Sequence, residues 1–250
     1  MSMKGDEPDL HEIDRYDGGV GWIAYPEEAM ERASHAVVVS NDEADAGDAD
    51  DADDAGDEAD AGDADDIWVI DPVDAPGVDD LLDELGTVAG VVVGLDRHVR
   101  DADAVAARHD VPVYAPEWMT GIESDLDPGV DVERFGARLA DTGFEAIRVR
   151  DSSVPPWQEV GLFDGETLIV PESLGTATYF RGDRERLGVH PMLRLTPPTA
   201  LTGLNPERVL VGHGVGVHER AAIAVEDALT DSRRKAPGLY AKTLRSALPI

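Results

Sequence analysis

The stretch Val91-Val92-Val93-Gly94-Leu95-Asp96-Arg97-His98-Val99-Arg100-Asp101-Ala102 decides the fold of this chain. Its three valines predict a buried strand, and the residues from about 101 to 109 place their apolar side chains on one stripe of a helix. The polar residues in between therefore follow the carboxyl end of a strand, where α/β proteins commonly bind ligands. His98 and its neighbouring carboxylates suit a metal ion, but several other positions of the loop hold residues that bind none. The stretch therefore predicts architecture more clearly than catalysis.

Helices and strands alternate on both sides of this stretch. Two earlier apolar runs predict the arms of a β-hairpin, and two later runs predict a second hairpin around the turn dipeptide Asp164-Gly165. The alternation of strand and helix between them implies helices packed on a partly parallel sheet. The expected strands are His35–Val39, Ile67–Ile70, Val91–Val93, Val111–Ala115, Ala146–Arg150, Glu159–Phe163, Thr167–Val170 and Arg208–Val211, and the expected helices span Val78–Leu85, about 101–109 and about 218–229.

One segment differs from the rest in composition. Asn41–Asp66 contains 14 acidic residues, no basic residue and no large apolar side chain to bury, so we expect a disordered, solvated loop rather than a metal-sequestering segment. The expected division is an N-terminal segment (1–34), one domain (35–230) with the acidic insertion at 41–66, and a basic C-terminal tail (231–250). The five cationic side chains of this tail are expected to dock on the protein's own acidic surface rather than on a partner or a membrane.

The charge of the chain indicates its environment. It has 53 acidic and 21 basic residues, a net charge of −32, and only three lysines. Such a surface keeps a protein hydrated in molar salt, where repulsion is screened over about 3 Å. We therefore expect a cytoplasmic protein of an extreme halophile. The same surface repels the phosphates of nucleic acid, so no nucleic-acid partner is expected.

Several classes of protein are disfavoured by what the sequence lacks. No apolar run approaches the length of a membrane span, and the first residues lack the apolar core of a signal peptide, so no membrane association is expected. The chain has no cysteine, which excludes disulfides and thiolate metal sites. Glycine-rich phosphate loops and the nucleophile motif Gly-x-Ser-x-Gly are also absent from the sequence.

The order of these parts resembles that of the metallo-β-lactamase superfamily. The resemblance covers roughly residues 35–229 and rests on four places: the hairpin ending at Ile70-Asp71, the loop at 96–102, the hairpin leading into Glu172, and the turn Gly212-His213-Gly214. It implies an α/β fold, an αββα sandwich of two mixed β-sheets flanked by helices. In that family the metal ions lie at one edge of the sandwich, on loops that follow strands.

The family's main metal-binding motif, His-x-His-x-Asp-His, is altered in this chain. Its first pair of ligands binds one metal ion and its last pair binds a second. Residues 96–101 read Asp-Arg-His-Val-Arg-Asp, so that without a gap His98 keeps the second His, Arg100 replaces the Asp, and Asp96 and Asp101 replace the outer His residues. With one inserted residue, Asp101 keeps the Asp and Ala102 replaces the last His. Either register loses at least two of the usual ligands.

The remaining ligand positions are partly retained. The stretch Ser152–Trp157 stands where the family has a Pro-Gly-His turn and contains no His, whereas Glu172 stands in place of the bridging Asp and His213 matches the final His. The resemblance therefore implies at most four metal ligands: His98, Asp101, Glu172 and His213. Arg97 and Arg100 add permanent positive charge to the same loop, which disfavours a divalent cation.

Two functions of different classes follow from this resemblance. The first is a hydrolase-like protein without the full metal site and without a cofactor, which acts as a binding or scaffold protein and takes a small anionic ligand on Arg97 and Arg100. His98 then pairs with a neighbouring carboxylate, and the acidic residues of the site neutralise the arginines. The second is a metal-dependent hydrolase of thioesters, lactones or phosphoesters with a mononuclear or rearranged zinc or iron site. His109 and His190 are interpreted as structural, Trp157 as lining or plugging a pocket, and an unrelated α/β fold as the third alternative.

Overall fold

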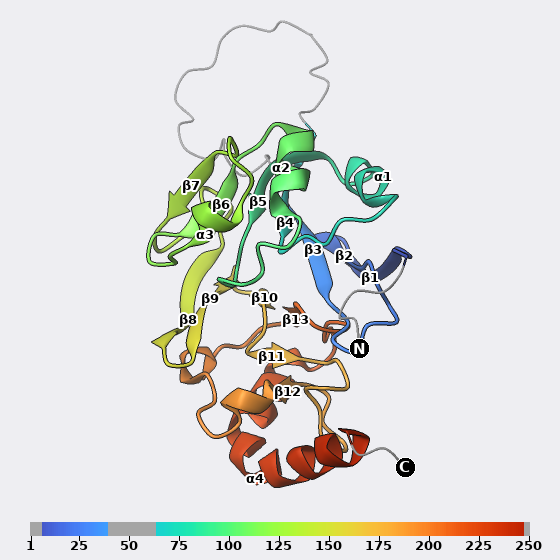
Figure 1. Ribbon diagram of the computed structural model, residues 1–250, viewed down its shortest axis with the longest axis vertical. Helices are drawn as coiled ribbons and strands as arrows, with labels where there is room; N and C mark the ends of the chain where they lie inside the picture. Colours follow the sequence, from blue (N-terminus) through green and yellow to red (C-terminus); the bar gives the residue numbers. More distant parts are fainter. Residues whose placement is uncertain (1–6, 40–63, 248–250) are drawn as a thin grey trace, which may run out of the picture.

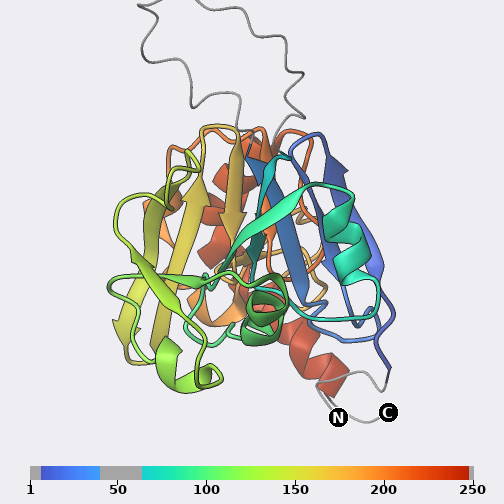
Figure 2. The ribbon, with the colours of Figure 1, turned by 90° about the horizontal axis from the view of Figure 1, so that it is seen from above.

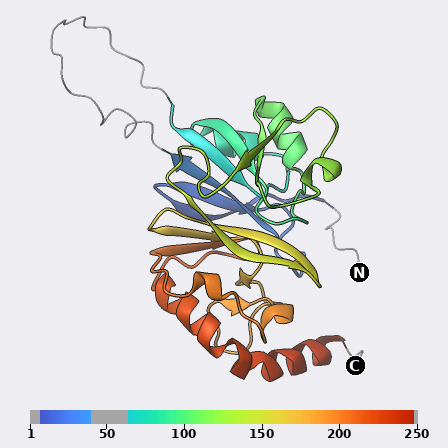
Figure 3. The ribbon, with the colours of Figure 1, turned by 90° about the vertical axis from the view of Figure 1, so that its left-hand side faces the viewer.

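Two β-sheets lie face to face, with helices on both outer sides (Figures 1 and 3). The computed structural model describes residues 7–39 and 64–247. Figure 3 shows the layers edge on: the first sheet is covered by α1 (Val78–Asp83), α2 (Ala102–His109) and α3 (Ile122–Asp125), and the second sheet by α4 (Ala221–Ala247). The predicted αββα sandwich of two mixed sheets is confirmed.

The first sheet has seven strands in chain order, antiparallel from β1 to β4 and parallel from β4 to β7. Its third and fourth strands form the predicted first hairpin, with His35 opposite Ile70 and Val39 opposite Asp66. Figure 2 shows these strands from above. The strands are β1 (His11–Tyr16), β2 (Gly19–Ile23), β3 (Ala33–Val39), β4 (Asp66–Ile70), β5 (Thr87–Val92), β6 (Val113–Pro116) and β7 (Val132–Phe135).

The second sheet has the order β13-β10-β9-β8, with the pair β10·β13 parallel and the other pairs antiparallel. Its bounds are β8 (Glu145–Ser153), β9 (Pro156–Phe163), β10 (Thr167–Val170) and β13 (Arg208–Val211). The predicted hairpin around Asp164-Gly165 is the turn between β9 and β10. A two-stranded sheet, β11 (Leu174–Gly175) with β12 (Gly188–Val189), and two 3₁₀ turns, Pro191–Leu193 and Thr199–Leu201, lie in the connection to β13.

Burial on both faces explains why β10 and β13 are continuous apolar runs in the sequence. Ile169 and Leu210 point into the core between the two sheets, in one cluster with Val37 and Ile70 of the first sheet. Their neighbours Leu168, Val170, Val209 and Val211 pack into a second core under α4, against Ala221, Ala224, Val225 and Ala228. Successive residues of a strand face opposite sides, so α4 can cover this sheet only because both of its faces are apolar.

The sandwich extends beyond both ends of the predicted domain. The segment 1–34 contains β2, which pairs with β3, and β1, which pairs with β2. The expected helix at 218–229 continues as α4 to Ala247 through Pro237. Residues of the expected basic tail therefore belong to a helix. The acidic insertion lies outside the described residues except for its last three, of which Asp66 begins β4. Among the described residues, no helix is long and apolar enough to cross a membrane.

Candidate metal centre

His98 is held by a carboxylate that comes from the end of β4. The side chain is buried, and its Nδ1 lies 3.0 Å from Asp71 Oδ2, while Asp71 Oδ1 accepts a hydrogen bond of 2.8 Å from the Gly94 amide. Burial lowers the pKa of His98 well below its usual value, and the nearby Arg100 and Arg97 lower it further, so the ring is neutral. A neutral ring that donates to Asp71 through Nδ1 leaves Nε2 unprotonated, with Arg100 Nη2 at 3.5 Å from it. The predicted pairing of His98 with a carboxylate is confirmed.

His213 has the same arrangement at the end of β13. Its Nδ1 lies 2.9 Å from the carbonyl oxygen of Met30, which only accepts hydrogen bonds, so Nδ1 carries the proton. Its Nε2 is buried and has no hydrogen-bond partner among the described residues. Burial, with a smaller effect of nearby His98 and Arg100, holds the pKa of His213 well below its usual range. The residue therefore presents a neutral, unused nitrogen to the protein interior.

Glu172 follows β10 and faces both histidines. Its Oε2 lies 3.6 Å from His98 Nε2 and 2.8 Å from the Nη2 atom of Arg97, and its Oε1 lies 3.4 Å from His190 Nε2. Burial raises the pKa of Glu172 to about 7, although Arg97 opposes this shift. Its backbone is fixed by the fully buried Glu159, whose Oε1 accepts hydrogen bonds of 2.7 Å from the amides of Glu172 and Ser173.

These three side chains form a group that suits one metal ion. One ligand atom of each of His98, Glu172 and His213 lies within 4.8 Å of the others. Two neutral imidazoles and one carboxylate are a donor set that zinc uses in catalytic sites, with a fourth position left open. The carboxylate and the carbonyl that hold the two Nδ1 atoms are the second-sphere contacts typical of metal-bound histidines. The buried Nε2 of His213, unpaired within the described part of the chain, shows that the residues present fit such an ion.

Arg100 lies directly beside these three side chains and adds a positive charge, which limits how many cations the site can hold. Its guanidinium donates hydrogen bonds to the carbonyl oxygens of Ala33 (2.7 Å), Asp71 (2.8 Å) and Gly212 (3.2 Å), and lies 3.5 Å from His98 Nε2. Burial lowers the pKa of Arg100 to about 10, so it remains charged at neutral pH. The expected pairing of Arg100 with carboxylates is therefore replaced by contacts with backbone carbonyls. A fixed positive charge at this distance disfavours a second metal ion.

Arg97 covers the group from the outside. It forms ion pairs with Asp96 (3.2 Å) and Glu172, as predicted, and its guanidinium lies 4.1 Å from the ring centre of Trp157. The Trp157 side chain is buried, whereas that of Arg97 is 40% exposed. Arg97 therefore packs on the buried Trp157 ring and separates Glu172 from solvent.

Asp101 is the predicted ligand that the fold does not bring to the group. It stands at the N-cap of α2, and its Oδ2 accepts a hydrogen bond of 2.9 Å from the Asp74 amide. Two residues that sequence reasoning did not assign to the site do belong to it: Asp71 holds His98, and His190, interpreted as structural, contacts Glu172. Asp71 follows a predicted strand directly, which is the signal that could have identified it.

The glycine at 214 is needed to place His213. Its φ is +91°, and a Cβ atom there would lie 2.4 Å from Thr176 Oγ1 and 2.5 Å from the Ala177 amide nitrogen. We expect Gly214→Ala to reduce the free energy of unfolding by about 1–3 kcal/mol, measured by urea denaturation. Gly165→Ala is the control, because Gly165 also has a positive φ (+102°) but nothing within 4 Å of the added Cβ. Equal losses of unfolding free energy in the two variants would show that the close contacts of a Cβ atom at position 214 do not contribute to the destabilisation.

Comparison with known proteins gives matches only at the level of structure. No family model and no curated protein matches the sequence. The structure is similar to that of DIM-1 metallo-β-lactamase, with a TM-score of 0.54 and 12% sequence identity over 93% of this chain and 99% of that one. The Flv1 flavodiiron core from Synechocystis sp. PCC6803 is similar with a TM-score of 0.58 and 12% identity over 92% of this chain and 62% of that one. These similarities, together with the two mixed sheets and their outer helices, show that the chain has the metallo-β-lactamase fold.

Proposed function

We propose that this protein binds one divalent metal ion, zinc or iron, between His98, Glu172 and His213 and acts as a single-metal hydrolase. The observation that carries the proposal is the buried His213 Nε2, which has no hydrogen-bond partner within residues 7–39 and 64–247. A buried polar atom left unpaired costs about 1–3 kcal/mol. The fold nevertheless fixes this nitrogen through the Met30 carbonyl and directs it toward Glu172 and His98. A metal ion would satisfy the nitrogen and account for the arrangement.

The surrounding residues support this proposal through their protonation and position. A bound zinc or iron ion would supply a Lewis acid that polarises an oxygen of the substrate. Asp71 and the Met30 carbonyl keep both histidines in the tautomer with an unprotonated Nε2. His190 accepts a hydrogen bond from the Met192 amide at Nδ1, so its Nε2 carries the proton and is directed at Glu172 Oε1. Arg97 is exposed enough to move away and admit a ligand. Thioesters, lactones and phosphoesters are the proposed substrate classes.

A metal-free binding or scaffold protein is the second candidate. The observation that favours it is the ion pair of Arg97 with Glu172, which neutralises the carboxylate without any ion. Binding of a small anionic ligand to Arg100 is less well supported, because the Nη atoms of Arg100 already contact backbone carbonyls. The net charge of −32 supports the further proposal that the protein, whichever of the two functions it has, works in the cytoplasm of a halophile.

Metal analysis of the purified protein separates the two candidates. We expect one zinc or iron ion per chain in protein purified in molar KCl without chelator. We also expect hydrolysis of at least one of a thioester, a lactone and a phosphodiester, lost on chelation and restored by the metal. Protein that stays far below one ion per chain, even after incubation with zinc or iron(II), would contradict the metal centre. Stoichiometric metal without hydrolysis of any of the three substrates would contradict the hydrolase.

A further inference from the structure

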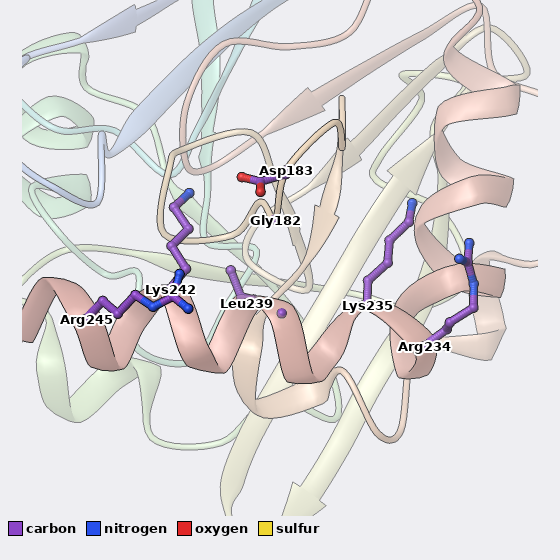
Figure 4. A pocket seen from close by; sticks show the side chains of 8 residues that line it. Gly182, Asp183, Arg234, Lys235, Leu239, Lys242 and Arg245 are labelled. Carbon is purple, nitrogen blue, oxygen red and sulfur yellow. The ribbon is translucent and has the colours of Figure 1, made fainter.

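A cavity with basic walls lies between α4 and the connection from β11 to β12 (Figure 4). Its volume is about 600 Å³, which is within the range of small-molecule sites. We call it the basic cavity; it is lined by Gly182, Asp183, Arg234, Lys235, Lys242 and Arg245, among others. None of these residues belongs to the candidate metal centre.

The charge of the basic cavity is opposite to that of the chain as a whole. Residues 232–250 contain five basic residues and no acidic one, in a chain with a net charge of −32. Two of the three lysines of the sequence, Lys235 and Lys242, line the cavity, and Asp183 is the one acidic residue in its lining. Figure 4 shows both lysines projecting from α4 on the side of the loop that carries Gly182 and Asp183. The cations are therefore concentrated on this part of the molecule.

The nearby carboxylates do not fully neutralise these cations. Lys242 Nζ lies 3.0 Å from the Arg181 carbonyl oxygen and 3.3 Å from that of Thr178, which position the ammonium group without cancelling its charge. Arg245 makes no hydrogen bond or ion pair with any described residue. Lys235 and Arg234 share the carboxylate of Asp231, at 3.1 and 2.7 Å.

The other carboxylate near Lys235 is already used. Glu185 lies 3.8 Å from Lys235 Nζ but pairs with both Nη atoms of the buried Arg194, at 2.8 and 2.7 Å. Lys242 and Arg245 thus provide positive charge that no described carboxylate neutralises, and Asp183 alone opposes it from the wall of the cavity.

A small anion with several charges suits this arrangement. In molar salt, charges interact over only about 3 Å, so an anion is bound only where several cations contact it at once. Lysine binds phosphate as a point charge and arginine binds it with a fork of donors, and the basic cavity offers both. From these observations we infer that the basic cavity binds a small molecule carrying a diphosphate or triphosphate group. This inference does not rest on the metal centre.

Calorimetric titration of the full chain with pyrophosphate and with ATP tests the inference. We expect binding of one anion per chain that persists in molar KCl. Arg245→Gln and Lys242→Gln are each expected to weaken it by about tenfold or more, the effect of losing a charge-assisted hydrogen bond. Arg245 is exposed and has no described partner, so its replacement leaves the fold intact.

Arg138→Gln is the matched control, because Arg138 is also exposed and lies outside the cavity, 3.7 Å from Glu145. It makes the same change in net charge and is expected to leave binding unchanged. The inference would be overturned if neither anion bound, or if Arg138→Gln weakened binding as much as Arg245→Gln. Citrate is the carboxylate probe: equal affinity for citrate and pyrophosphate would overturn the assignment to phosphate.

Discussion

His213→Ala is expected to abolish stoichiometric metal binding. The substitution removes one of three ligand atoms that lie within 4.8 Å of one another. Changes to second-sphere partners already lower metal affinity about 10–100-fold, so loss of a ligand is expected to lower it by more than about 100-fold. Affinity is measured by competition with a chromophoric chelator, and bound metal by elemental analysis after gel filtration.

Two further variants make this result specific. Asp71→Asn keeps the size of the side chain that holds His98 Nδ1 but removes its charge, and is expected to lower affinity by only about 10–100-fold. His109 lies at the end of α2, away from the three metal ligands, and its imidazole contacts Asp79. His109→Ala is therefore expected to retain full metal content. If His213→Ala retained the metal, or if His109→Ala lost it, the ion would be bound elsewhere.

The sequence predicted the strands of the two central hairpins because their side chains are apolar over several consecutive residues. β3 and β4 pair as expected although the acidic insertion separates them. β1 and β2 were not predicted, because β1 is largely exposed and polar and β2 contains two glycines among its five residues. The length of α4 was also missed, since Pro237 and the basic residues after Leu229 are typical of a helix end. Packing under the second sheet stabilises the first part of α4.

Less of the candidate site could be predicted, because its contacts join distant parts of the chain. His98, Glu172 and His213 were identified from the family resemblance, and the fold brings them together. Asp101 stands close to His98 in the sequence, yet the start of α2 turns its carboxylate toward the Asp74 amide. Asp71 lies 27 residues before His98, so local spacing gives no sign of their contact.

Arg194→Ala is expected to be the most destabilising substitution of a charged residue considered for this fold. Arg194 is fully buried and donates to both carboxylate oxygens of Glu185 and to the carbonyl oxygens of Val189 (3.0 Å) and Phe180 (2.5 Å). Its removal leaves the Glu185 carboxylate buried, with a hydrogen bond of 2.6 Å from the Gly182 amide and with Lys235 as a distant charged partner at 3.8 Å. Breaking a buried pair in this way costs about 3–5 kcal/mol. The loss is measured as the change in free energy of unfolding in urea at constant KCl.

Arg234→Ala is the control for a surface ion pair. Arg234 pairs with Asp231 at 2.7 Å but its side chain is 73% exposed, so its removal is expected to cost at most about 1 kcal/mol. The effect of Arg194→Ala is expected to be the same in low and high KCl, because a buried pair is screened far less than a surface pair. A loss below about 1 kcal/mol for Arg194→Ala would show that the pair contributes no more than a surface contact.

The pH dependence of stability gives an independent measure of the same pair. Burial, the largest single effect, raises the pKa of Glu185, but the hydrogen bonds from Arg194 and the Gly182 amide, together with the charges of Arg194 and Lys235, outweigh it and lower the pKa below the usual value. A carboxyl whose pKa is lowered on folding stabilises the fold at neutral pH, and this contribution is lost as the pH falls below about 4. That acid-dependent part of the stability is expected to disappear in Arg194→Ala. Arg194 also donates a hydrogen bond to the backbone carbonyl oxygen of Phe180, and the Phe180 ring stacks on His213 with 5.3 Å between ring centres. The variant is therefore also expected to bind metal more weakly.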